Sequence, residues 1–382
     1  MPTGPGDVLE LIRHGRARTR GEVLDVTGLS RMTVSQRVDA LLSSGLVVEG
    51  PDGGATGGRR PRSLRFNASH GRVVAASVDT THTRVAITDL DGVVSADRDV
   101  DVQVTSGPAH TLDALTDAAL GLLGPDGLRD VCGVGISVPG PVDPESGRPS
   151  QPPIMPGWDA YPIAEHVSGA LPGVPVLTAN DADAAALGEH SAGYPAARAL
   201  CLVKVSTGIG TGIVIDGHPY RGADGGAGDI GHVRLRSHSD AQCMCGGRGC
   251  LAAVASGRAI ATALTELGIR AESGRDVRRL LAVGSPEASR LTQQAGRHIG
   301  EVMATVVSVL NPQVVVVGGA LASSPLIAGI RETLYTLSLP RATRHLALQL
   351  GRLGDDAPIV GLSRLVVEDR FSAQAVNATL VG

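Results

Sequence analysis

The chain has 382 residues, of which 42% are hydrophobic and 2% aromatic, and its formal net charge is −4. This length suffices for two or three domains, but apolar runs such as 314–317 are far shorter than the roughly 20 residues of a membrane span. The scarcity of aromatic rings also argues against base-stacking surfaces for single-stranded nucleic acid.

The amino-terminal segment differs in charge from the rest of the chain. Residues 1–66 contain ten arginines and seven acidic residues, whereas the remainder is net acidic. A basic head on an acidic body favours contact between the head and a polyanion such as nucleic acid. Because the first residues lack the apolar core and the cleavage site of a secretory signal, we expect a cytoplasmic protein with no membrane partner.

The first 45 residues predict three short helices. Thr19 is placed to cap the second helix, Gly28 turns the chain after it, and Ser30 and Thr33 are placed to cap the third. The third helix has one apolar stripe and one polar face, and the amino-terminal half of such a helix enters the major groove in helix-turn-helix proteins. We therefore predict DNA contacts from Arg31, Thr33, Ser35, Gln36 and Arg37.

Two short β segments at 46–49 and 63–66 predict a hairpin that resembles the wing of a winged helix-turn-helix domain. The arginines expected to reach phosphates or a narrow minor groove from its tip are Arg59, Arg60 and Arg62. The alternative is a three-helix interaction module with a solvated basic loop. We assign residues 1–67 to a DNA-binding domain and 68–71 to a linker.

From residue 72 the pattern changes to strands that alternate with helices, which predicts an α/β architecture. A hairpin at 73–92 and a helix at 111–123 are followed by buried strands that meet glycine-rich turns within 131–140, 201–217 and 312–321, and the last of these strands opens into a helix. The backbone N–H groups of such turns can bind phosphate, but tight turns also need glycine for purely conformational reasons.

Two polar residues, Asn180 and Asp181, lie where a predicted strand meets an alanine-rich helix. In one interpretation Asp181 simply caps the helix. In the other, its carboxylate takes a proton from a sugar hydroxyl that Asn180 orients, which is the general-base role in phosphoryl transfer. The residues alone favour neither interpretation.

A cysteine-rich segment, CMCGGRGC, follows a histidine by eleven residues. Three thiolates and one imidazole form a complete tetrahedral Zn²⁺ set, and the intervening glycines let a short loop fold around the ion. The alternative is a disulfide or a set of buried free thiols, but only Cys132 and Cys201 remain elsewhere. Because the set leaves no position open, we predict a structural zinc. Its ligands would be His232, Cys243, Cys245 and Cys250.

Together these motifs resemble the ROK family of repressors, open reading frames and sugar kinases. The resemblance covers nearly the whole chain and is carried by GISVPGPVD, PPIMPGW, NDADAAALGE, STGIGTGIVIDG, GDIGH, the cysteine loop and NPQVVVVGGAL. It implies an actin-like ATPase (ribonuclease H-like) fold of two lobes with a sugar site between them. We therefore expect a ROK domain at 72–382, with a small lobe at about 72–180, a large lobe at about 181–365 and a C-terminal segment that returns to the small lobe.

The resemblance also implies roles for individual residues. Asp181 would be the base in kinase members, and a zinc beside the sugar would orient the sugar-binding loop rather than perform chemistry. The implied sugar contacts are Asn180, Asp181, Asp229 and His232. The implied nucleotide contacts, weak or vestigial in this chain, are Asp79, Gly208, Gly210, Gly212, Gly318 and Gly319.

Three departures from the family's pattern argue against kinase activity. The first phosphate loop usually reads Asp-x-Gly-x-Thr, but residues 79–83 place side chains where backbone should approach phosphate. Asp229 replaces the glutamate of the GEIGH-type motif, and Ala252 replaces a second glutamate, which removes a sugar contact worth about 1.5 to 3 kcal/mol. We expect a sensor of a sugar or sugar phosphate, with an ATP- and Mg²⁺-dependent sugar kinase as the alternative.

The sequence thus predicts a transcriptional regulator, and specifically a repressor of carbohydrate uptake or catabolism. We expect a homodimer or homotetramer on double-stranded operator DNA, in which a small movement between lobes changes the spacing of two heads. A regulator that binds no ligand and keeps the fold only for dimerisation is a third possibility.

Overall fold

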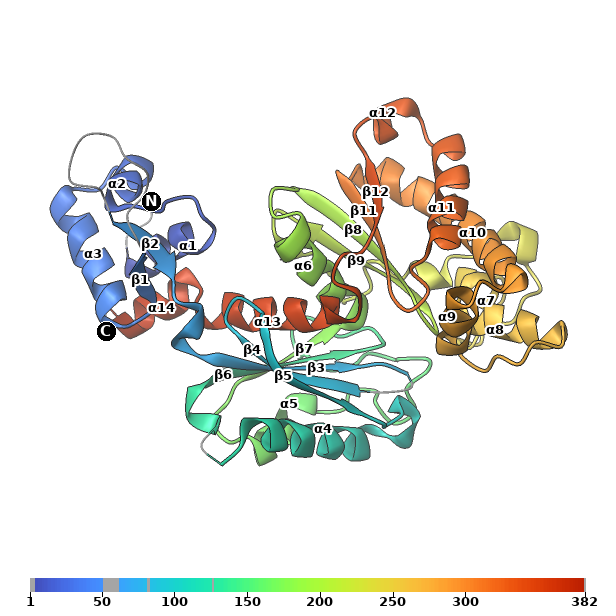
Figure 1. Cartoon of the computed structure of the whole chain (residues 1–382), viewed down its shortest axis with the longest axis horizontal. Helices are drawn as coiled ribbons and strands as arrows, with labels where there is room; N and C mark the ends of the chain where they lie inside the picture. The colour runs from blue at the N-terminus through green and yellow to red at the C-terminus, as the bar shows by residue number, and fades with distance from the viewer. Residues whose placement is uncertain (1–3, 51–61, 81–82, 126, 381–382) are drawn as a thin grey trace.

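The computed structural model describes residues 4–50, 62–80, 83–125 and 127–380, and it has an amino-terminal head and two larger lobes (Figure 1). The head contains three helices, α1 (Pro5–Arg13), α2 (Arg20–Thr27) and α3 (Arg31–Ser43). They are followed by two antiparallel strands, β1 (Val47–Gly50) and β2 (Ser63–Phe66).

Side-chain caps define where the helices of the head begin. The hydroxyl of Thr19 accepts a hydrogen bond from a first-turn amide of α2 at 3.2 Å. The hydroxyl of Ser30 does the same for the amide of Thr33 in α3 at 3.1 Å, so Ser30 alone is the cap and Thr33 supplies the capped amide. Gly28 ends α2 with φ +67°, a left-handed conformation that favours glycine.

The first lobe is built on a five-stranded sheet in the order β5-β4-β3-β6-β7. Its strands are β3 (Arg72–Val78), β4 (Thr83–Asp89), β5 (Val94–Val100), β6 (Val131–Val138) and β7 (Val176–Asn180). Strands β3, β4 and β5 are antiparallel, and β6 and β7 are added in parallel. Helices α4 (Pro108–Leu123) and α5 (Ile163–Ala170) cover one face of this sheet, and α13 crosses the other (Figure 1).

The second lobe has a five-stranded sheet in the order β10-β9-β8-β11-β12. Its strands are β8 (Ala199–Val205), β9 (Ile209–Ile215), β10 (His218–Pro219), β11 (Val314–Gly318) and β12 (Ala347–Leu350). Its helices are α6 (Asp181–Gly193), α7 (Leu251–Ala255), α8 (Gly257–Glu266), α9 (Gly274–Ala282), α10 (Pro286–Leu310), α11 (Ser324–Leu337) and α12 (Pro340–Thr343). The helix predicted directly after β11 begins only at Ser324, because Gly319 first turns the chain with φ +86°.

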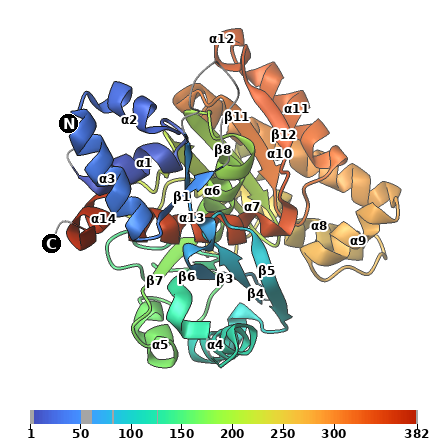
Figure 2. The same cartoon turned by 60° about the vertical axis from the view of Figure 1, so that its left-hand side comes forward.

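Two C-terminal helices join the head to both lobes. Helix α13 (Ala357–Arg370) packs against α6 and against the sheet of the first lobe, and α14 (Ala373–Leu380) packs against α1. Figure 2 also shows α1 and α14 side by side. Val366, Val367 and Phe371 share one hydrophobic core with the helices of the head. The head is therefore packed on the body and does not hang from a linker.

Short 3-10 turns connect the main elements. One of them, Ala68–His70, occupies the predicted linker directly before β3. The others lie at Val104–Ser106, Gly127–Asp130, Ile230–His232, Arg236–His238 and Gly354–Asp356. Among the described residues, no helix combines the length and apolar character needed to span a bilayer.

Candidate functional site

A cavity of about 290 Å³ lies between the two lobes. Its walls include the 139–141 turn after β6, the 206–208 turn between β8 and β9, and the first residues of β9. Small-ligand sites usually measure about 300–1,000 Å³, so this cavity suits a small polar molecule. The lining contains every residue for which a sugar contact is expected, namely Asn180, Asp181, Asp229 and His232.

Asn180 is the last residue of β7 and the cap of α6. Its side-chain oxygen accepts hydrogen bonds from the amides of Ala182 (2.9 Å) and Asp183 (3.2 Å), and its Nδ2 donates to the carbonyl of Gly140 (2.9 Å). The interpretation in which Asp181 caps this helix is therefore wrong, because the cap is the residue before it. Asn180 instead fixes Asp181 at the wall of the cavity.

Asp181 is paired with a lysine at the base of the cavity. Its carboxylate, in a residue that is 8% exposed, accepts a hydrogen bond from Nζ of Lys204 in strand β8. The same Nζ lies 3.9 Å from a carboxylate oxygen of Asp79, which follows β3. Burial lowers the pKa of Lys204, but the charges of Asp181 and Asp79 outweigh burial and raise it above its usual range. The ammonium therefore stays charged.

Asp183, in the first turn of α6, is a second buried carboxyl group, but unlike Asp181 it has no cationic hydrogen-bond partner among the described residues. It is 5% exposed, and its Oδ1 has no hydrogen-bond partner among the described residues. Burial raises the pKa of Asp183 to about 7, although the charge of Arg221 acts in the opposite direction. Sequence reasoning did not single out this residue, since its position in the helix resembles that of an exposed first-turn acid.

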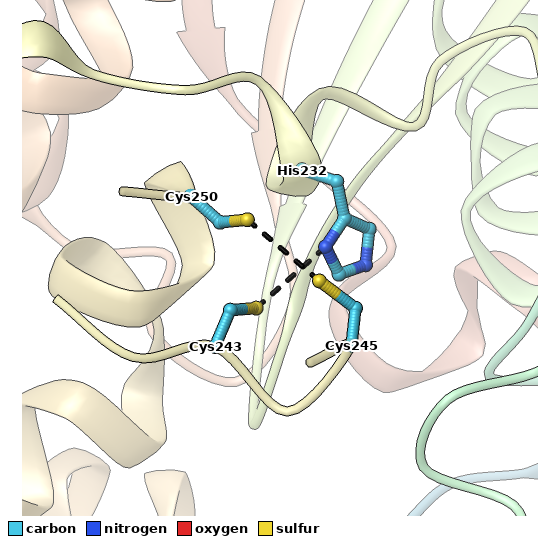
Figure 3. A group of neighbouring side chains, drawn as sticks. All are labelled: His232, Cys243, Cys245 and Cys250. Carbon is cyan, nitrogen blue, oxygen red and sulfur yellow. Dashed lines mark hydrogen bonds between the residues drawn. The ribbon is translucent and has the colours of Figure 1, made fainter. Parts of the chain in front are cut away.

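A candidate metal centre lies beside the cavity (Figure 3). One ligand atom from each of His232, Cys243, Cys245 and Cys250 lies within 4.8 Å of the others, and the four side chains point to a common centre. Nδ1 of His232 is 3.7 Å from Sγ of Cys243, and Sγ of Cys245 is 3.8 Å from Sγ of Cys250. Tetrahedral ligands at zinc distances would be roughly 3.3–3.8 Å apart, so these two distances suit Zn²⁺, and the donor set suits it in chemistry.

His232 connects this cluster to the cavity. Its Nε2 lies 3.9 Å from a carboxylate oxygen of Asp229, while its Nδ1 faces the sulfur atoms. A carboxylate on the second ring nitrogen is the usual way to orient a metal-binding imidazole. Asp229 therefore lines the cavity and lies next to His232, although 3.9 Å is longer than a hydrogen bond.

The glycines for which nucleotide contacts are expected do not line a single cavity. Gly208 and Gly210 line the larger cavity, whereas Gly318 and Gly319 line a second cavity of about 110 Å³. Asp79 borders both cavities.

Gly212 belongs to neither lining and has a packing role. A Cβ at this position would lie 2.1 Å from the carbonyl oxygen of Ala182, so its missing side chain lets β9 approach α6.

The turns that would hold phosphate also touch each other, since the hydroxyl of Thr80 donates to that of Thr207 at 2.8 Å. Residues 81 and 82 of the first turn lie outside the described residues.

Arg258 lines the cavity, although no sequence motif predicted it. Ala252, the position of the expected glutamate, is 8% exposed and borders the cavity, and the half-buried Arg258 of α8 lines the same cavity. The cavity lining thus includes two cationic side chains, Lys204 and Arg258, and has an alanine at the position of the expected glutamate.

The head lies at one end of the molecule (Figure 1). On α3, Arg31 and Gln36 are exposed, whereas Thr33, Ser35 and Arg37 are partly buried. Met32, which was not predicted to contact DNA, is 73% exposed on the same helix.

Two of the residues for which DNA contacts are predicted, Ser35 and Arg62, already have partners within the head. The hydroxyl of Ser35 accepts a hydrogen bond from Arg20 (3.0 Å) and donates to Asp39 (3.1 Å), so it braces α2 against α3. On the hairpin, Arg62 pairs with Glu49 at 2.5 Å. Arg59 and Arg60 lie outside the described residues.

Comparisons with known proteins agree with this architecture. A family model described as ROK family matches residues 74–369. The xylose repressor of Bacillus spizizenii is 30% identical over 357 residues, which cover 92% of this chain and 91% of the repressor.

Two solved structures share the fold. A ROK family transcriptional regulator, a homologue of the Escherichia coli MLC protein, matches with a TM-score of 0.80 at 24% identity, over 99% of this chain and 98% of the regulator. A ROK family glucokinase from Streptomyces griseus, solved with glucose and AMPPNP, matches with a TM-score of 0.68 at 26% identity, over 77% of this chain and 99% of the kinase. The expected two-lobed, actin-like fold is confirmed, and the chain belongs to the ROK family.

Proposed function

We propose that this protein is a sugar-responsive, DNA-binding transcription regulator, and specifically a repressor of carbohydrate uptake or catabolism. One observation carries the proposal, namely that α13 connects the head to the interlobe cavity. Helix α13 shares a hydrophobic core with the helices of the head, and it also packs on α6, which begins at the cavity. The xylose repressor matches nearly the whole chain, whereas the glucokinase match leaves part of it without a counterpart.

The head acts as a winged helix-turn-helix domain. Helices α2 and α3, with the left-handed turn at Gly28 between them, present the polar amino-terminal half of α3 to a major groove. Base and phosphate contacts come from Arg31, Thr33, Ser35, Gln36 and Arg37, and the β1–β2 hairpin acts as the wing with Arg59, Arg60 and Arg62. A DNA target places the protein in the cytoplasm.

The effector is a sugar or sugar phosphate that binds in the larger cavity. Asp181 and Asp229 offer carboxylate acceptors to its hydroxyl groups, and Asn180 and His232 complete the polar lining. Zn²⁺ held by His232 and the three cysteines braces this wall. Its role is structural, because the four protein ligands leave no position for water or substrate.

The signal travels from α6 to α13 and then to the head. The two helices cross at Gly188 and Gly361, where added Cβ atoms would lie 2.0 and 1.8 Å from backbone oxygens of the opposite helix. Backbones in such close contact leave no space for independent sliding, so a shift of α6 on sugar binding also moves α13. In a homodimer or homotetramer, this movement changes the spacing of recognition helices that must match half-sites about 34 Å apart.

The DNA-binding half of the proposal is tested with purified full-length protein and a library of random duplexes. We expect selection of a palindromic site, with binding that weakens as salt rises. Arg31→Ala and Gln36→Ala should each weaken binding to the selected site about tenfold. Arg270→Ala, on a second-lobe side chain that is 90% exposed, is the matched control and should bind as wild type. Failure to select any sequence would contradict this half.

Sugar sensing has a built-in reporter. The chain's single tryptophan, Trp158, is fully buried and donates from Nε1 to the carbonyl of Val104 at 2.9 Å, and Val104 borders the cavity. Its emission should change on titration with xylose, glucose, N-acetylglucosamine, mannose or glucose 6-phosphate. The sugar that changes it should also alter affinity for the selected duplex. Operator affinity that is indifferent to all of these sugars would count against the sensor.

A sugar kinase is the second candidate, and one observation favours it. Asp181 lies at the wall of the larger cavity, and a second cavity lined by Gly318 and Gly319 adjoins it in the place that ATP with Mg²⁺ would need. Release of ADP with the same sugars, abolished by Asp181→Asn, would establish this activity.

A further inference from the structure

Lys204 is the single lysine among the 34 basic residues of the chain. It is the second-last residue of β8 and is one of the residues that line both the larger and the smaller cavity, together with Asp79, Ser206 and Thr207. The side chain therefore stands in the partition between the two cavities. A phosphoryl group that passed from a nucleotide to a sugar would have to cross this partition.

The strands beside Lys204 leave room for its side chain. Its partner across β9 is Gly210, and its partner across β11 is Gly318. Directly opposed residues in a sheet place their side chains on the same face, so two glycines remove the side chains that would flank the lysine. No side chain of β9 or β11 therefore stands directly opposite Lys204.

The charges around Lys204 are arranged as they would be around a metal ion. Asp79 comes from the first lobe and Asp181 from the start of α6, and both carboxylates converge on Nζ. The three side chains are only 15%, 23% and 11% exposed for Lys204, Asp79 and Asp181. Two carboxylates at this depth are the usual ligands of a divalent cation that also holds phosphate.

A lysine suits this position better than an arginine would. An ammonium is a compact point charge with three donors, whereas a guanidinium is a broad planar fork. All other basic side chains of the chain are arginines, so the exception falls where a compact cation between two carboxylates is needed.

We propose that Lys204 is an internal cation that takes the place of a divalent metal between Asp79 and Asp181 and closes the passage between the two cavities. The cleft is thereby a receptor that does not transfer phosphate. Asp181, bound to an ammonium, orients a sugar hydroxyl as a hydrogen-bond acceptor and does not remove its proton. The inference rests on the proposed function only in that the occupant of the larger cavity is a sugar.

Mn²⁺ binding, followed by electron paramagnetic resonance on the zinc-loaded full chain, tests the inference. Wild type should show no Mn²⁺ site that depends on Asp181. Lys204→Met, which keeps length and removes charge, should bind Mn²⁺ at least tenfold more tightly than wild type. Asp181→Asn/Lys204→Met should return to the wild-type level. Equal Mn²⁺ binding by wild type and Lys204→Met, whether both bind or neither does, would overturn the inference.

A second measurement uses wild type alone and serves if Lys204→Met does not fold. Selective ¹⁵N-lysine labelling gives a single ammonium signal by NMR, apart from any other amine. Because the ammonium lies in an ion pair away from solvent, we expect its protons to exchange slowly. Because it excludes a divalent metal, we expect that added Mn²⁺ does not broaden its signal. Fast exchange typical of an exposed lysine would overturn the inference. Sugar-dependent DNA binding is measured separately, so failure of the internal cation and failure of the sensor give different results.

Discussion

Arg13 of α1 and Glu368 of α13 form an ion pair that joins the head to the rest of the molecule. The side chain of Arg13 is 3% exposed, and its second terminal nitrogen donates to the carbonyl of Val367 at 3.1 Å. Arg364 and His14 both contact Oε1 of the same carboxylate, whereas Arg13 contacts Oε2. A charge that is buried with such partners holds two elements in one register, because any slip would leave it unpaired.

Loss of this pair should weaken the connection between the head and α13. We expect Arg13→Met to lower the free energy of unfolding by roughly 2–4 kcal/mol, because the carboxylate of Glu368 loses a buried partner. The variant should still bind the selected duplex but respond less to the effector sugar. Urea unfolding and fluorescence anisotropy measure the two effects. Arg270→Met, at an exposed pair with Glu272, is the control, and equal losses in both variants would contradict this role.

The same carboxylate should make the molecule sensitive to acid. Burial alone would raise the pKa of Glu368, but the hydrogen bond from His14 and the charges of Arg364 and Arg13 lower it to about 2. A depressed pKa contributes stability that is present above the ordinary value near 4.5 and is lost as pH falls toward 2. Unfolding curves at pH 6 and pH 3.5 should therefore differ more for wild type than for Glu368→Gln. Parallel pH profiles for the two proteins would contradict the prediction.

The crossing of α6 and α13 predicts an unusual effect of alanine. In an exposed helix, Gly→Ala stabilises by about 1 kcal/mol. At Gly361 the new Cβ would meet the carbonyl oxygen of Ala184 at 1.8 Å, so we expect Gly361→Ala to destabilise by about 1–3 kcal/mol and to impair the sugar response. Gly169→Ala in α5, where nothing lies within 4 Å, is the matched control and should be neutral or stabilising. Thermal unfolding compares them.

Local signals in the sequence predicted much of this molecule. The caps at Thr19 and Ser30, the ligand spacing of the cysteine loop and the polar pair at 180–181 each depend on residues that are close in the chain. Lys204, Arg13 and Arg258 were missed because their partners or neighbours come from distant elements, so no local pattern marks them. The interior glycines of α6 and α13 were a usable signal, since glycine within a helix usually has a packing reason.

Asp183 gives the opposite pH dependence to Glu368. Its pKa is raised to about 7 by burial, so the folded state favours the protonated form. The stability that this preference contributes is complete below the ordinary value near 3.8 and is lost as pH rises through about 7. The stability advantage of Asp183→Asn over wild type should therefore grow between pH 4 and pH 8, by roughly 2–4 kcal/mol. Asp99→Asn, at an exposed position, should show no such difference. An advantage that does not grow with pH would argue against this account.

Removal of the metal should affect the sugar cavity before it affects the head. Cys245→Ser leaves three of the four ligands, and we expect its zinc content, measured by mass spectrometry, to fall far below the stoichiometric level of wild type. Because His232 and the cavity wall then lose their metal, we expect sugar affinity, measured by the emission of Trp158, to fall roughly 10–100-fold. Affinity for the selected duplex without sugar should stay near the wild-type value, because the hydrophobic core that holds α3 and the hairpin includes no described residue of the cysteine loop. Cys132→Ser, at the half-buried cysteine beside the head, is the control and should keep both zinc and sugar binding. Undiminished sugar binding in zinc-free Cys245→Ser would show that the metal braces some other part of the second lobe.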